Sequence, residues 1–224
     1  MTASTSREAQ LRRDGWTFAD DLIDASTFAA LQAEVGATLD AAGVRREMTI
    51  PTTGNSPRRY TLASRAALST GTVVPSLYRD ARIIDRLSEL AGEQLVPVPF
   101  EPEEFVATRM QFTGDTHGWH WDDYAFALVF VLHAPSAGGA VETIRDTEWN
   151  KRDPRVADYT RERTIDRFAP RAGQAYLIRA DTTLHRVAPL EDDDLREVVT
   201  FSYARAAYAE LAGAHETLEA LIGN

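Results

Sequence analysis

The stretch GDTHGWHWDDYAFALVFVL, residues 114–132, is the part of this chain from which both the fold and the chemistry can be inferred. Its first half gathers histidines, tryptophans and aspartates, and its second half is a run of apolar, β-favouring residues. Such a run predicts a buried strand. If residues 120–122 are extended, the side chains of His120 and Asp122 project from the same face, and Trp121 points the other way. An imidazole and a carboxylate would then face one point beside a strand.

A third metal ligand would have to come from another strand, and His185 in the segment TTLHRVAPL is the candidate. Two histidines and one carboxylate on one face of an octahedron leave three positions open, which is the ligand set of non-haem Fe(II) oxygenases. Arg196 begins the next β-like segment, REVVTFSYA. Its guanidinium could bind the far carboxylate of a chelating oxo-acid, because it pairs with carboxylates bidentately and keeps its charge.

Short β-like segments follow one another after Gly92, separated by turns that contain Gly, Pro and Asp. Helices first and then about eight strands predict a mainly β protein with helical additions. The expected core is a double-stranded β-helix, that is, a jelly-roll or cupin-like barrel, flanked by N-terminal helices. The expected strands are QLVPVPF, EFVATRMQF, YAFALVFVL, AVETI, RTIDRF, QAYLIRA, LHRVAPL and REVVTFSYA.

The first 92 residues are expected to be mostly helical, with one short strand at WTFADDLI. A short helix ends at Gly15, a second runs from a cap at Asp24 or Ser26 to about Ala42, and a third runs from Pro75 to Gly92. The composition of PTTGNSPRRY, residues 51–60, predicts a loop, and residues 51–62 are a candidate lid over the pocket.

These segments predict one domain spanning residues 1–224, a usual length for a single barrel with additions. Residues 1–92 would form the helical support and the lid loop. Residues 93–205 would form the barrel core, and residues 206–224 a C-terminal helix.

The composition argues against several classes of protein. A formal net charge of −10 disfavours nucleic-acid binding, which needs clustered Lys and Arg. The absence of cysteine excludes disulfides, thiolate ligands and thiol catalysis. No signal peptide and no apolar segment long enough to cross a bilayer is recognised. We therefore expect a cytoplasmic protein that acts on a small molecule, without nucleic-acid or membrane partners; the sequence favours no oligomeric state.

The quoted segments resemble the Fe(II)/2-oxoglutarate-dependent oxygenases. More narrowly, residues 114–132, NSPRR, AGQAYLIRADTTLHRVAPL and the trailing arginine are similar to the BesD/HalD-like family of free-amino-acid halogenases and related hydroxylases. The resemblance extends over residues 55–204. It implies that His120, Asp122 and His185 bind Fe(II), that Arg196 binds 2-oxoglutarate, and that O2 is the oxidant.

Asp122 bears on the choice between halogenation and hydroxylation. In the halogenases of this family the corresponding position holds a small residue, which leaves room for chloride on the iron. A carboxylate at this position fills the coordination site and repels an anion. The resemblance together with Asp122 therefore implies the hydroxylase branch, with C–H hydroxylation coupled to conversion of 2-oxoglutarate to succinate and CO2.

The resemblance also implies residues that contact an amino-acid substrate. A zwitterion needs an anion for its amine and a cation for its carboxylate, and buried polar groups left unpaired are costly. Lysine is the first expectation for the substrate, with arginine, ornithine or another polar amino acid as alternatives, free or bound to a carrier. The expected contacts are His117, Asp123, Glu103 (or its neighbour Glu104), Arg58, Arg59, Thr200 and Ser202.

Two other functions are compatible with the same residues. A cupin-type metalloenzyme could use the two histidines and the aspartate with another divalent metal, as an isomerase or hydrolase. A non-catalytic small-molecule binder is the second alternative. The presence of Arg196 favours the oxygenase, because neither alternative has an oxo-acid for it to bind.

Overall fold

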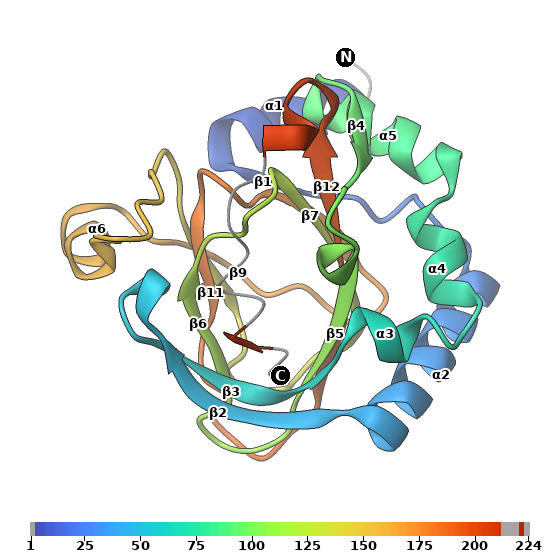
Figure 1. The fold of residues 1–224 in the computed structure, drawn as a ribbon, viewed down its shortest axis with the longest axis horizontal. Coiled ribbons are helices and arrows are strands. Elements are labelled where there is room, and N and C mark those ends of the chain that lie inside the picture. The colour runs from blue at the N-terminus through green and yellow to red at the C-terminus, as the bar shows by residue number, and fades with distance from the viewer. Residues whose placement is uncertain (1–2, 212–219, 222–224) are drawn as a thin grey trace.

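The computed structural model describes residues 3–211 and 220–221. Its strands curve into a barrel, α2 to α5 lie on one side of the barrel, and α6 lies on the opposite side (Figure 1). The sheet order is β1-β10-β7-β12-β5-β3-β6-β11-β8-β9, with β2 added to β3 and β4 added to β12. All neighbouring strands are antiparallel. This mainly β architecture, with its double-stranded β-helix core, confirms the predicted fold class.

Each of the eight predicted β-like segments contains a strand. β1 lies within the short strand predicted at WTFADDLI, and β2, β3 and β6 were not predicted as strands. The strands are β1 (Trp16–Phe18), β2 (Val44–Ile50), β3 (Ser56–Ala63), β4 (Leu95–Pro97), β5 (Phe105–Met110), β6 (Thr116–His120), β7 (Phe126–His133), β8 (Val141–Ile144), β9 (Asp166–Phe168), β10 (Ala175–Arg179), β11 (Leu184–Val187) and β12 (Arg196–Arg205).

Helices α2 to α5 buttress one side of the barrel. Helix α2 begins after Asp24, whose side chain accepts a hydrogen bond from the Thr27 N–H, as expected for an N-cap. Its buried residues join a core that includes Phe105 and Phe130 of the sheet. The helices are α1 (Ala3–Asp14), α2 (Ala25–Ala42), α3 (Arg65–Leu68), α4 (Val73–Tyr78), α5 (Ala81–Ala91) and α6 (Val156–Glu162), with 3-10 turns η1 (Pro51–Thr53), η2 (Glu101–Glu103) and η3 (Ala206–Leu211).

The single helix predicted from Pro75 to Gly92 is in fact two helices, α4 and α5. Asp80 separates them, because its backbone is extended and its side chain caps α5 by accepting from the Arg82 N–H. Gly92 ends α5 in the left-handed conformation at φ 71°, as its position predicted.

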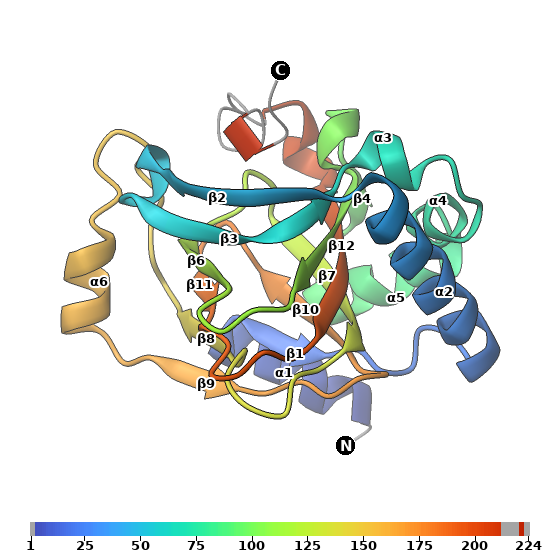
Figure 2. The ribbon, with the colours of Figure 1, turned by 90° about the horizontal axis from the view of Figure 1, so that it is seen from below.

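The predictions of a loop over residues 51–60 and of a lid over residues 51–62 were wrong. Strand β3 begins at Ser56 and pairs with β2, β5 and β6, so most of this segment is fixed within the sheet (Figure 2). Only residues 51–55 form the turn between β2 and β3. Buried and exposed residues alternate along this segment, as in a strand with one buried face: Ser56, Arg58 and Tyr60 are buried, and residues 55, 57 and 59 are exposed. The alternation was hidden because two of the three inward residues are polar.

The predicted C-terminal helix, residues 206–224, falls largely outside the described residues. Residues 206–211 form the 3-10 turn η3, and Leu221 lies buried against Ile50 and Tyr60. Within the described part of the chain, no helix is both long and apolar enough to cross a membrane.

Candidate active site

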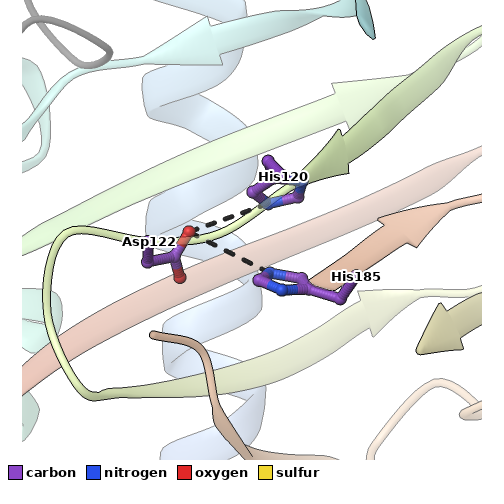
Figure 3. Close-up of side chains that lie close together, drawn as sticks. All are labelled: His120, Asp122 and His185. Atoms are coloured by element: carbon purple, nitrogen blue, oxygen red, sulfur yellow. Dashed lines mark ion pairs between the residues drawn. The ribbon is translucent and has the colours of Figure 1, made fainter. Parts of the chain in front are cut away.

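Strands β6 and β11 bring the two expected histidines together. His120, the last residue of β6, stands opposite His185 in the register between these strands. Asp122 follows β6 by two residues, and its N–H donates to the carbonyl of Ala180 at 3.1 Å. Its Oδ1 lies 3.7 Å from Nε2 of His120 and 4.0 Å from Nε2 of His185, and the three side chains converge (Figure 3). The three ligand atoms lie within 4.8 Å of one another, close enough to share one metal ion.

Hydrogen bonds orient both imidazoles for metal binding. Nδ1 of His120 lies 2.7 Å from the Gly118 carbonyl, and Nδ1 of His185 lies 2.9 Å from the Thr183 carbonyl. A carbonyl can only accept, so each Nδ1 carries the proton, and each Nε2 offers its lone pair toward Asp122. The backbone of the two strands therefore selects the tautomer that a metal requires.

Burial sets the ionisation of these three groups. It lowers the pKa of His120 well below its usual value and that of His185 to about 4, so both imidazoles are neutral, the form that binds metal. Burial, with the negative charge of Asp123, raises the pKa of Asp122 to about 7. A bound dication would favour the charged carboxylate, because an ion is the largest local charge in such a site.

Arg196 fits the carboxylate of an oxo-acid cosubstrate. It begins β12 and is 2% exposed, and its Nη2 has no hydrogen-bond partner among the described residues. Its hydrogen bond and charge interaction with the Tyr176 hydroxyl oppose the lowering of its pKa by burial. A buried guanidinium without a carboxylate partner is costly unless an anion is supplied. Arg196 and Tyr176 together therefore suit the distal carboxylate of 2-oxoglutarate.

Arg58 is a second buried cation at the same cavity. It is 0% exposed and donates to the Ser56 hydroxyl at 2.8 Å and to the Thr53 hydroxyl at 3.3 Å. Among the described residues its Nε has no hydrogen-bond partner, and the negative charge of Asp122 only partly opposes the lowering of its pKa by burial. The neighbouring Arg59 is exposed on the outer face of β3, so the structure does not bring it to the cavity.

The three metal ligands form part of the lining of one cavity, whose volume is about 980 Å³ including its open mouth. The alternation of β12 directs Arg196, Thr200 and Ser202 into it. Glu104 faces elsewhere and pairs with Arg65 and Arg79, which leaves Glu103 as the acidic residue at the cavity. The expected residues that line it are Arg58, Glu103, His117, His120, Asp122, Asp123, His185, Arg196, Thr200 and Ser202.

Two acidic residues, Glu103 and Asp123, lie close to Asp122 in the cavity lining. Glu103 hydrogen-bonds Asp123, and burial together with the charges of Asp123 and Asp122 raises the pKa of Glu103 to about 9. Glu103 is therefore protonated at neutral pH and donates to Asp123. Asp123 also accepts from Nζ of Lys151 at 2.5 Å. The lining of the cavity thus includes both an acidic pair and, at Arg58, a cation.

Gly118 on β6 allows the close approach that holds this site together. A Cβ at this position would lie 2.7 Å from the Pro57 carbonyl oxygen and 2.9 Å from the Pro57 nitrogen. We expect Gly118→Ala to lower the free energy of unfolding by about 1–3 kcal/mol, measured by urea denaturation, because β3 and β6 must separate. Gly36→Ala is the matched control. No atom lies within 4 Å of its added Cβ, so it should raise stability slightly. Equal stability of the two variants would contradict this account.

The sequence comparison agrees with this geometry. A protein family described as halogenase D matches residues 2–223. The chain belongs to the halogenase D family. No curated protein sequence matches it. The family, the fold and the His-Asp-His site place the protein among the 2-oxoglutarate-dependent dioxygenases, which use Fe(II), 2-oxoglutarate and O2.

Solved structures share the fold of this halogenase D family member at low identity. The 2-oxoglutarate-dependent epimerase SnoN from nogalamycin biosynthesis is 20% identical with a TM-score of 0.69, covering 91% of this chain and 81% of its own. An oxidoreductase of the 2OG-Fe(II) oxygenase family from Burkholderia pseudomallei is 18% identical with a TM-score of 0.63, covering 91% and 92%. EctD from S. alaskensis, with 2-oxoglutarate and 5-hydroxyectoine, is 16% identical with a TM-score of 0.65, covering 92% and 77%.

Two residues of the halogenase D family site were not predicted from the sequence. Tyr176, beside Arg196, could have been found from the alternation of QAYLIRA, which directs Tyr176 and Ile178 to one face. Lys151 lies in a segment between β8 and α6 for which no structure was predicted. Its one sequence signal is that it is the only lysine in the chain.

Proposed function

We propose that this protein hydroxylates a free polar or cationic L-amino acid, with a lysine-like substrate first. Hydroxylation would be coupled to conversion of 2-oxoglutarate to succinate and CO2. The observation that carries the proposal is that one cavity is lined by charged groups of both kinds: a cation, Arg58, and an acidic pair, Asp123 and Glu103, together with the metal ligands. A zwitterionic amino acid with a second amine matches that pattern of charge.

The proposal assigns a role to each group of residues. His120, Asp122 and His185 hold the Fe(II), and Arg196 with Tyr176 holds 2-oxoglutarate. Fe(II) bound there would supply the means to activate O2 for attack on an unactivated C–H bond. The remaining residues position the substrate so that one carbon is presented to the metal, since such reactions depend on orientation.

On this proposal, the polar lining of the cavity binds the two ends of the substrate. Arg58 pairs with the α-carboxylate, and His117, Thr200 and Ser202 add hydrogen bonds. His117 stacks on His120 with the ring centroids 3.9 Å apart, so a substrate held by His117 lies next to a metal ligand. Asp123 accepts from an amine, and the carbonyl oxygen of protonated Glu103 can accept as well. Replacing one of these partners by an apolar group would leave a buried charge unpaired, which is the basis of specificity.

The experiment that tests the function measures succinate formation with Fe(II), 2-oxoglutarate and O2 across a panel of free L-amino acids. We expect stimulation above the background by one or a few polar members, with a product heavier by one oxygen atom in mass spectrometry. Apolar amino acids such as norleucine serve as controls. Succinate formation that no amino acid stimulates would contradict the proposed substrate class.

A chloride arm of the same assay tests the choice between hydroxylation and halogenation. Asp122 provides a carboxylate at the metal and a negative charge against a second anion, so we expect no chlorinated product even at high chloride concentration. The products are compared by mass spectrometry with and without chloride. A chlorinated amino acid would show that Asp122 does not exclude the halide.

A further inference from the structure

Lys151 is the single lysine among 24 Lys and Arg residues, and it lies beside the acidic pair of the cavity. Its Nζ is 2.5 Å from Oδ1 of Asp123, whose side chain is 8% exposed, whereas the side chain of Lys151 is 25% exposed. Lys151 does not line the cavity itself, but Asp123 and Glu103 do. The cation therefore reaches the carboxylate of Asp123 from the outer side of the cavity.

The segment that carries Lys151, residues 145–155 between β8 and α6, contacts the site through Trp149. The Trp149 Nε1–H donates to the Thr52 carbonyl at 2.7 Å, in the turn next to Thr53, which binds Arg58. The Trp149 ring stacks 6.1 Å from that of Trp121, the residue between two metal ligands. Nζ of Lys151 lies 4.6 Å from the centroid of the Trp149 ring, a cation–π contact. Trp149 thus connects Lys151 to the turn that binds Arg58 and to the segment that carries the metal ligands.

We propose that Lys151 is a tethered competitor for the substrate's amine: its ammonium occupies the cation-binding position at Asp123 until a cationic substrate displaces it. The inference rests on the proposed function in one respect, that the substrate carries an amine. It goes further by assigning a residue outside the predicted site a part in selecting the substrate.

The chemistry of the two ammonium groups supports displacement. A substrate amine offers Asp123 the same charge and the same kind of N–H donor as Lys151 does. Asp123 already interacts with both Glu103 and Lys151, so a substrate ammonium competes with Nζ of Lys151 for the same carboxylate. Lys151 has a flexible stem and is already partly exposed, so its charge can return to water at low cost.

The same exchange would favour cationic substrates over neutral ones. A neutral amino acid that displaced Lys151 would leave Asp123 buried without a counter-ion, which is costly. A cationic amino acid replaces the lost ion pair. Discrimination then comes partly from a penalty on the wrong ligand rather than from attraction of the right one.

The single lysine makes the displacement directly observable. Protein prepared with 13C-labelled lysine gives one Cε–Hε signal, displaced upfield by the Trp149 ring while Nζ stays above it. The full chain is loaded with 2-oxoglutarate and Zn(II), which is diamagnetic and prevents turnover. L-lysine, L-ornithine and L-arginine are the probes, and L-norleucine is the control. We expect at least one cationic probe to move the signal to the position of a solvent-exposed lysine, and norleucine to leave it in place.

Binding to variants provides a second measurement, which follows tryptophan fluorescence. Lys151→Met removes the competing charge and keeps the length of the side chain, so we expect the cationic probe to bind about tenfold more tightly. Arg161→Met is the matched control on α6. It removes one charge from an exposed ion pair with Asp158, and should leave the affinity unchanged. A fixed counter-ion that only holds Asp123 in place predicts the opposite for Lys151→Met, namely weaker binding.

Three results would overturn the proposal: a cationic probe that binds while the Lys151 signal stays in place, weaker binding to Lys151→Met, or no binding of any cationic probe to either protein. The third result, no binding of any cationic probe, can be distinguished from a failure of the proposed function by the succinate assay. Succinate formation stimulated by a neutral amino acid would retain the hydroxylase and discard the displacement of Lys151.

Discussion

Replacing His185 with alanine is expected to abolish succinate formation that depends on the amino-acid substrate. His185 supplies one of the three ligand atoms, and its Nδ1 contact with the Thr183 carbonyl shows that the backbone holds the ring for this purpose. Changing only the hydrogen-bond partners around metal ligands costs about 10–100-fold in affinity or activity. Loss of the ligand itself should therefore cost more, at least about 10³-fold in kcat/KM. The same result is expected for His120→Ala.

His133→Ala is the matched control for these two variants. His133 ends β7, and its Nδ1 lies 2.8 Å from Oε2 of Glu197, on the face of β12 opposite to Arg196. Its loss should leave turnover close to that of the unchanged protein. An anaerobic titration with Fe(II) and 2-oxoglutarate adds a readout other than activity. The visible charge-transfer band should form with His133→Ala and be lost with His185→Ala. Full activity of either ligand variant would disprove the assignment of the metal site.

The metal ligands could be predicted because their geometry depends on local backbone rules. Residues two apart on an extended chain share a face, and this places His120 and Asp122 together without knowledge of the fold. The prediction of His185 as the third ligand required one further assumption, that its own β-like segment belongs to the same barrel. The register between β6 and β11, which sets His185 opposite His120, meets that assumption.

The sequence alone could not show which of two neighbouring residues of the same charge faces the cavity. Arg58 and Arg59 differ only in the face of β3 to which they belong, and that face is fixed by pairing with β5 and β6. A segment rich in Pro, Gly and Asn predicts a loop by composition, although tertiary pairing makes it a strand. Glu103 and Glu104 differ in the same way, since the two buttress arginines Arg65 and Arg79 neutralise Glu104.

The contact of Lys151 with Asp123 could not be predicted, because it depends on the path of a segment without regular structure. Residues 145–155 have no periodic pattern, and their path is set by Trp149 at Thr52 and by Val156 against Gly54. Such long-range packing leaves no signal in local sequence. The sequence does show that Lys151 is the only lysine and that all other basic residues of this kind are arginines. That observation points to a function only once the ion pair with Asp123 is known.

Replacing Arg58 with methionine is expected to lower kcat/KM for the amino-acid substrate by about 30-fold to 5 × 10³-fold, because truncating one partner of a buried charge pair costs about 2–5 kcal/mol. The variant should still fold, since Arg58 has no carboxylate partner among the described residues, and an apolar residue removes a buried charge. Its hydroxyl partners, Ser56 and Thr53, retain a hydrogen bond to one another. Arg59→Met, one residue away on the exposed face, is the matched control and should leave kcat/KM unchanged.

The carboxamide of the substrate separates a role in binding from a role in stability. The unchanged protein should prefer the carboxylate to the carboxamide strongly, because only the carboxylate neutralises Arg58 in its buried position. The Arg58→Met variant should lose most of this preference, since neither ligand then has a cation to pair with. The four values of kcat/KM form a double-mutant cycle, in which a general loss of structure would lower both substrates equally. An unchanged preference in the variant would place the substrate's carboxylate elsewhere, and Arg58 would then have a structural part in the turn at Thr53.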